Sequence, residues 1–260
     1  MNILAFICVF FLLMVSVSAE TRYDTNSLIA DDIRFRQAVV DRLCDIDEHI
    51  SMTSLNLTDS DITNLTIQSD IKSLVDSESL IRSALYISQN GEIMAAYPES
   101  VIMNNNSFYE DLINNDIRTP QIVGNTSFEL LPGDSIPFYG KIFIYPVRTT
   151  RGIEHMVLFL DADNLCRQAA KDVGLSPVLF SVVIDKDETV LWCSDYDELN
   201  SIPPDDVLTE FPTFREVKEL ILYAWSGRTI YDVWNEGLVR NGAWSSVQFY
   251  NQVLKIFVAG

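Results

Sequence analysis

Apolar residues recur every three to four positions from Asp31 onward, which is the spacing of an amphipathic helix. Asp31 or Asp32 can cap this helix, because a carboxylate accepts hydrogen bonds from first-turn N–H groups. A polar break over residues 54–61 precedes a second helical pattern, and together the two patterns predict a helical stem over residues 24–79. The side chains expected to face inward are Ile33, Val40, Leu43, Ile46 and Ile50, then Ile62, Leu65, Ile71, Leu74 and Val75.

From residue 80 onward, apolar and polar positions alternate as they do in strands. Asn90-Gly91 lies between two alternating runs and favours the tight turn of a hairpin. The expected elements are strands 83–89 and 93–97, a helix 107–114, a turn-rich loop 115–137, strands 141–148 and 154–161, and a helix 163–172. This block predicts an antiparallel sheet flanked by helices.

The same succession of elements repeats in the rest of the chain. Strands are expected at 178–185, 189–194, 228–234, 243–250 and 253–258, and an amphipathic helix at 214–225 with Val217, Leu220, Ile221 and Ala224 facing inward. Two blocks are too few for a solenoid. The predicted fold class is α+β, with a long N-terminal helical stem and two modules, residues 80–174 and 175–260, each an antiparallel sheet flanked by helices.

The amino terminus carries an apolar run of the length of a secretory leader. Residues 2–18 read NILAFICVFFLLMVSVS, and small residues at Ser18 and Ala19 suit a cleavage site. Residues 1–19 are therefore expected to be a signal peptide or an uncleaved N-terminal anchor. Either alternative predicts an exported protein, extracellular or at the cell surface.

The charge balance limits the classes of partner. The chain has 18 Lys and Arg residues against 37 Asp and Glu residues, a formal charge of −19. Nucleic acids and anionic lipid surfaces attract clustered basic residues, so the balance argues against both as partners. Asn-x-Ser/Thr sequons beginning at Asn56, Asn64, Asn105 and Asn125 fit an exported glycoprotein.

Cysteine and histidine usage leaves little room for a metal. Beyond the leader lie Cys44, Cys166 and Cys193, which either include one disulfide or are small buried apolar residues. The sequence has only two histidines, His49 and His155, and no Cys-x-x-Cys pair, which argues against a zinc site. We therefore expect no metal and no cofactor.

Three segments together carry a resemblance to a known family. SALYISQNGEIMAAYPES and FSVVIDKDETVLWCSD each read as strand, polar turn, strand, with Glu188 in the second where glycine is common. MVLFLDADNLCRQ reads as a closing strand that ends in an aspartate and runs into a helix. With the apolar leader and the stem, this order over residues 31–260 resembles the double Cache sensor domains, which consist of two tandem PAS-like modules.

The resemblance implies a small extracytoplasmic ligand, usually bound in the membrane-distal first module. The polar candidates for such a site are Tyr109, Arg118, Tyr139, Tyr145 and Asp161. Arg118 can clamp a carboxylate, Asp161 can accept from an ammonium group, and the three tyrosines can line the site. No tryptophan precedes Trp192, so the full amino-acid motif of the family is not met and carboxylates and amines stay open.

Each candidate also has a purely structural interpretation. Asp161 stands directly before a predicted helix and can simply cap it. Tyr145 can be an ordinary half-buried strand residue, and Arg118 can pair with a surface carboxylate. For the whole chain the alternative function is a structural or adhesive envelope protein without a small ligand.

Enzyme motifs do not support a catalytic function. The sequence contains no Gly-x-Ser-x-Gly elbow, no phosphate-binding Gly-x-x-x-x-Gly-Lys loop and no His-Glu-x-x-His pair, so we expect no enzymatic activity. A binding module of this kind needs a partner for its output. We expect a separate membrane signalling protein or a homodimer formed through the stem helix.

Overall fold

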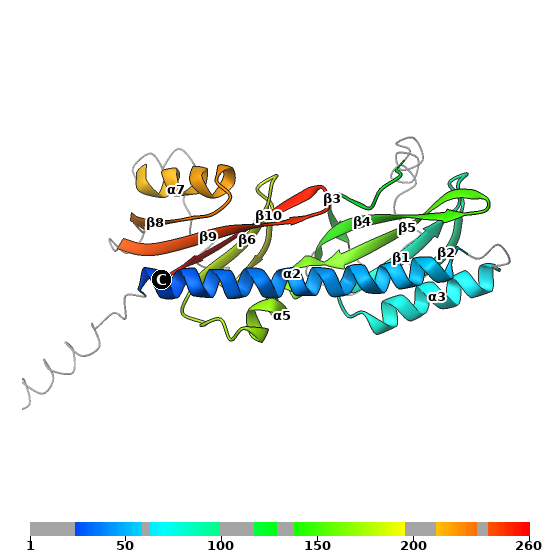
Figure 1. Cartoon of the computed structure of the whole chain (residues 1–260), viewed down its shortest axis with the longest axis horizontal. Coiled ribbons are helices and arrows are strands. Elements are labelled where there is room, and N and C mark those ends of the chain that lie inside the picture. Colours follow the sequence, from blue (N-terminus) through cyan, green and yellow to red (C-terminus); the bar gives the residue numbers. More distant parts are fainter. Residues whose placement is uncertain (1–23, 59–62, 99–116, 129–137, 196–211, 233–238) are drawn as a thin grey trace, which may run out of the picture.

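The computed structural model describes residues 24–58, 63–98, 117–128, 138–195, 212–232 and 239–260. The fold is α+β, with two antiparallel five-stranded sheets lying in a row along one long helix, α2 (Thr25–Asn56). Figure 1 shows α3 (Asn64–Ser77) and α5 (Ala162–Asp172) on the same side of the sheets as α2, and α7 (Pro212–Tyr223) on the other side of the second sheet.

Helix α2 spans 32 residues, about 48 Å at 1.5 Å per residue, and one stripe of it is buried along its whole length. The buried side chains are Leu28, Asp32, Phe35, Val39, Leu43, Ile46, Ile50 and Ser54. They recur every three to four residues and therefore lie on one face. The predicted stem with one interruption is confirmed, because α3 follows after a break.

Three details of the predicted stem are wrong. The helix begins at Thr25, so Asp32 is a buried mid-helix residue and not its N-cap. Ile33 is 48% exposed and Leu65 is 84% exposed, although both were expected to face inward. The buried stripe of α2 passes through Asp32, and the neighbouring position, Ile33, consequently points away from the sheets.

The first sheet has the strand order β2-β1-β5-β4-β3. Its strands are β1 (Ile81–Ile87), β2 (Ile93–Tyr97), β3 (Gln121–Phe128), β4 (Phe138–Thr149) and β5 (Gly152–Asp161). Strand β3 falls inside the predicted loop 115–137, which corrects that expectation. Its glycine and its neighbouring proline suggest a turn, but its backbone pairs with β4 at the edge of the sheet, where such residues are tolerated.

The second sheet repeats this order as β7-β6-β10-β9-β8. Its strands are β6 (Phe180–Asp185), β7 (Val190–Cys193), β8 (Gly227–Asp232), β9 (Val239–Phe249) and β10 (Gln252–Ala259). The predicted repeat of two similar blocks is therefore confirmed, and all five strands of the second sheet were expected, whereas β3 of the first sheet was not. On α7, Val217 and Ile221 are buried as expected, whereas Leu220 is 45% exposed.

Each sheet has two faces with separate cores. The faces toward α2 share one continuous apolar cluster, which runs from Leu28 to Leu74 along the helices and includes Phe143 and Ile256. The face of the first sheet away from α2 has its own cluster, and so does the face of the second sheet under α7. The outer face of the first sheet therefore has its own apolar cluster, separate from the core that packs against the stem.

The turn between β9 and β10 joins the two sheets to each other and to α2. The Asn251 side chain accepts from the Ile122 N–H at 2.8 Å and donates to the Ile122 carbonyl at 3.0 Å. The Tyr250 ring lies 5.0 Å from that of Phe143, and its hydroxyl donates to Asp47 of α2. These contacts fix the first module, the second module and the stem at one point.

Cys44 is exposed, Cys166 and Cys193 are buried, and no disulfide joins these three cysteines. Of the two alternatives left open by the sequence, the structure therefore supports small buried cysteines at positions 166 and 193. In the described ranges no helix is long and apolar enough to cross a membrane.

Candidate ligand-binding site

The outer face of the first sheet, on the side opposite α2, carries a buried apolar cluster. Its buried members are Leu85, Ile87, Ala96, Ile117, Ile142, Ile144, Val157 and Phe159. They come from β1, β2, β4, β5 and the residues before β3, because alternate residues of each strand point to the same face. Apolar walls with a few polar groups at the margin are typical of small-molecule sites.

Ser83 is a polar residue on this face that the sequence did not single out. It pairs with Phe159 across β1 and β5, and residues directly opposite in an antiparallel pair share a face. Its hydroxyl is buried and has no hydrogen-bond partner in the structure. A buried hydroxyl without a partner costs about 1–3 kcal/mol, so a bound polar group here would compensate for that cost. The only sequence signal was a small polar residue within an otherwise apolar strand.

Asp161 lies at the end of β5, two residues beyond Phe159, the partner of Ser83, and its side chain is already engaged on both oxygens. Oδ1 accepts from the Asn164 N–H at 2.8 Å, which makes Asp161 the N-cap of α5. Oδ2 accepts from Arg82, with Nε at 2.8 Å and a terminal guanidinium nitrogen at 2.6 Å. The capping interpretation is confirmed, and a role in ligand binding stays a prediction.

Arg82 is the second residue that sequence reasoning missed. The Arg82 side chain is 48% exposed and that of Asp161 is 3% exposed. The guanidinium group is therefore accessible to solvent, whereas the carboxylate that it contacts is buried. The strand register shifts between Ile81 and Ser83, at the position of Arg82. A guanidinium at the margin of an apolar face can bind a carboxylate in a bidentate way.

Arg118 lies at the other end of the same face. It follows Ile117, whose carbonyl oxygen is 2.9 Å from His155 Nε2. His155 and Asp161 are six residues apart on β5, which corresponds to about 20 Å. The structure therefore places the two charged candidates, Arg118 and Asp161, at opposite ends of the face and does not bring them together.

The three tyrosines are placed differently. Tyr145 packs into the cluster facing α2, with its ring 6.2 Å from that of Phe143, so it lies on the opposite side of the sheet from Ser83. Tyr109 lies outside the described residues. The backbone of Tyr139 belongs to β4 next to Gly140, which pairs with Asp161, and its side chain is outside the description.

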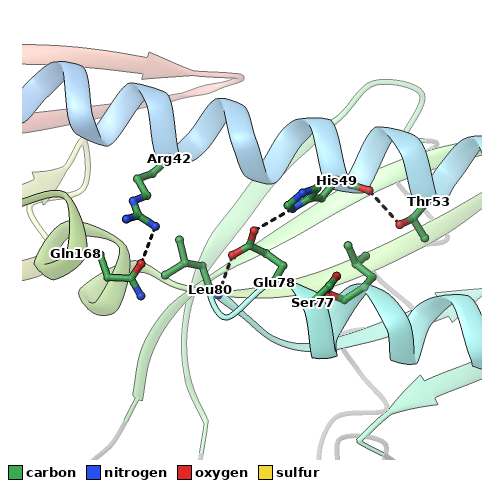
Figure 2. A network of polar contacts seen from close by, with 8 residues as sticks. Arg42, His49, Thr53, Ser77, Glu78, Leu80 and Gln168 are labelled. Carbon is green, nitrogen blue, oxygen red and sulfur yellow. Dashed lines mark hydrogen bonds and ion pairs between the residues drawn. The ribbon is translucent and has the colours of Figure 1, made fainter. Parts of the chain in front are cut away.

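A hollow lies beside α2, where the stem meets the first module, and Figure 2 shows polar contacts of the residues around it. It has a volume of about 300 Å³ and is lined by Arg42, Asp45, Glu48, His49, Glu78 and Leu80. Glu78 accepts from the Leu80 N–H at 3.2 Å, and its other oxygen lies 3.0 Å from His49 Nδ1. Arg42 donates to Gln168 at 2.7 Å and to Asp172.

These contacts tie α2 to α5 and to the residues between α3 and β1. The polar groups of the hollow thus serve the packing of the stem. Within the described ranges no group of three His, Cys, Asp or Glu residues is arranged to hold a metal ion.

Comparison with known proteins shows the fold and no closer relationship. No known family profile and no curated protein matches the sequence. An extracellular ligand binding receptor from Desulfohalobium retbaense superposes with a TM-score of 0.66 at 12% identity, over 90% of this chain and 40% of that one. The chain thus spans less than half the length of that receptor.

Chemoreceptors of Campylobacter jejuni are similar over nearly their whole sensory domains. The periplasmic sensory domain of Tlp1 has a TM-score of 0.62 at 11% identity, over 90% of this chain and 94% of that one. The sensory domain of Tlp3 with isoleucine bound has a TM-score of 0.59 at 13% identity, over 90% and 91%. The fold expected from the resemblance to the double Cache sensors is therefore confirmed.

Proposed function

We propose that the chain is an extracytoplasmic sensor that binds a small metabolite on the outer face of its first sheet. The observation that carries the proposal is the fold itself, which matches sensory and ligand-binding domains over 90% of the chain. None of these neighbours is described as an enzyme, which favours binding over catalysis. In this proposal the leader places the protein outside the cytoplasm, as a secreted or singly anchored module.

The charged groups at the margin of the face suggest the chemistry of the ligand. Arg82 and Asp161 at one end, and Arg118 at the other, supply a cation and an anion beside apolar walls. We propose a small carboxylate or amine as the ligand. Of the predicted set, Arg118 and Asp161 stay candidates at this face, whereas Tyr145 faces α2 and is not a candidate for it. Tyr109 and the side chain of Tyr139 lie outside the description and remain part of the proposal only. Ser83 and Arg82 are additions from the structure.

A sensor module acts by passing its ligand state to another protein or domain. We propose that ligand binding is communicated along α2, which contacts both sheets, to a membrane protein or to a second copy joined through the stem. The contacts of Tyr250 and Asn251 with α2 and β3 support this route, because they connect the two modules and the stem directly.

A thermal-shift screen of the full chain against small carboxylates, amino acids and amines tests this function. A ligand at 100 times its dissociation constant stabilises the folded state by about 2.7 kcal/mol, a shift of several degrees in Tm. For an anionic hit bound at the end of the face near Ile117, Arg118→Ala should abolish the shift; for a cationic hit it should leave the shift unchanged. A flat screen at millimolar concentrations would favour the structural or adhesive alternative instead.

A further inference from the structure

Two sequons flank the turn between α2 and α3, at the end of α2 remote from Thr25 (Figure 1). Asn56 is the last residue of α2 and Asn64 is the first residue of α3, and both are exposed. Their sequon hydroxyls belong to Thr58 and Thr66, which are exposed as well. Of the other two sequons, Asn105 lies outside the described residues and Asn125 lies in β3.

The same end of the molecule exposes large apolar side chains. Met52 is 59% exposed, Leu55 67% and Leu65 84%. Met52 lies four residues before Asn56 and therefore on the same side of α2. Leu65 is the central residue of the sequon Asn64-Leu65-Thr66. Both acceptor asparagines thus stand directly beside apolar surface that no described residue covers.

We propose that Asn56 and Asn64 carry N-linked glycans that cover this apolar end, defined by Met52, Leu55 and Leu65. The glycan donor is a polyprenyl-(pyro)phosphate-linked oligosaccharide of the export pathway. The Asn Nδ2–C1 bond forms, the C1–O bond to the lipid phosphate breaks, and the amide loses one proton. The polar glycan then takes the place that a packing partner would otherwise fill.

This inference rests on the proposed export of the chain and not on its ligand. Export brings the sequons to the glycosylation machinery, and ligand binding concerns a different face of the molecule. The two proposals can therefore fail separately.

Glycopeptide mass mapping of the full chain, recovered from the cells that make it, tests the modification. We expect glycan mass on the peptides with Asn56 and Asn64. Thr58→Ala and Thr66→Ala should each remove one glycan, whereas the matched variants Thr58→Ser and Thr66→Ser should retain it. Unmodified Asn56 and Asn64 in an exported chain overturn the proposal, and a chain found in the cytoplasm overturns it together with the proposed export.

A separate measurement tests whether the glycans cover the apolar side chains of Met52, Leu55 and Leu65. Enzymatic removal of the glycans from the folded chain should raise the fluorescence of a dye that binds apolar surface. Leu65→Gln, which keeps the sequon, should reduce that increase. Glycosylated sites whose removal leaves dye binding unchanged would overturn the covering role.

Discussion

The ammonium group of Lys141 in β4 contacts the carboxylate of Asp185 in β6, so a buried ion pair joins the first sheet to the second. The Lys141 side chain is 5% exposed and that of Asp185 is fully buried. Asp185 Oδ1 also accepts from the Asp187 N–H at 2.8 Å and from the Thr189 N–H at 2.9 Å. The pair therefore connects β4 to the turn between β6 and β7.

Lys141 and Asp185 should be energetically coupled, so that removing both costs less than the sum of removing each one. Lys141→Met leaves a buried carboxylate without its cation, and Asp185→Asn leaves a buried ammonium group, so each should lower the free energy of unfolding by about 3–5 kcal/mol. The double variant should lose clearly less than the sum of the two. Urea unfolding of the four proteins measures the coupling, and additive losses would show that the contact does not join the modules.

Asp32 should make the folded state less stable as the pH rises. It is 3% exposed beside β9, and burial raises the pKa of its carboxyl group from 3.8 to about 6, against the lowering effects of Ser245 and Arg36. The folded state therefore holds this proton more tightly than the unfolded state does. The stabilising contribution is complete below pH 3.8 and is lost as the pH rises through 6.

Asp32→Asn removes that dependence. We expect a gain in the free energy of unfolding of roughly 2–3 kcal/mol at pH 8 and little change at pH 3.5. The matched control is Asp45→Asn, at an exposed position of the same helix, which should change neither value. A gain that is equal at both pH values would contradict the assignment of the effect to ionisation.

The three described cysteines should differ sharply in reactivity. Burial raises the pKa of the Cys166 thiol, with Asp163 and Asp161 adding to the effect, so little thiolate forms. In the folded chain a thiol reagent should label Cys44 within minutes and reach Cys166 and Cys193 only on unfolding. Peptide mapping after timed labelling checks this, and a Cys166–Cys193 disulfide in the purified protein would contradict it.

Phe35 and Ile33 provide a test of which face of α2 is buried. Phe35 is fully buried, with its ring 5.3 Å from that of Trp192, whereas Ile33 is half exposed. Phe35→Ala should lower the free energy of unfolding by about 3–5 kcal/mol, and Ile33→Ala by less than about 0.5 kcal/mol. Equal losses in thermal or urea unfolding would mean that the stem is rotated from the orientation described.

The architecture was predictable from the sequence because it depends on the spacing of apolar residues and on the recurrence of the same strand patterns in the second half of the chain. Alternating runs such as 141–148 and 154–161 specify paired strands, and their recurrence specifies two sheets of the same order. The stripe on α2 was misplaced because helical spacing alone does not determine which of two adjacent positions, Asp32 or Ile33, faces the sheet. A buried carboxylate is rare, so the apolar neighbour was the natural expectation.

The candidate site was less predictable because it depends on which residues of neighbouring strands, such as β1 and β5, lie opposite each other. The expectation for Asp161 as a cap followed from its place before α5, and that part holds. Ser83 is a candidate only because its pairing with Phe159 places it on the outer face. Arg82 is a candidate only because it contacts Asp161. Neither contact can be read from the sequence. Strand parity puts Tyr145 on the face toward α2, but choosing which parity faces the stem requires the packing of β4.

Hydrogen–deuterium exchange of the full chain, with and without the best compound from the screen, tests the central claim most directly. If a small molecule binds the outer face of the first sheet, exchange should slow in β1 and in the part of β5 around Phe159, with little change in β7 and β8. Protection confined to the second sheet, or a compound that stabilises the chain without slowing exchange in β1 or β5, would contradict the proposed site.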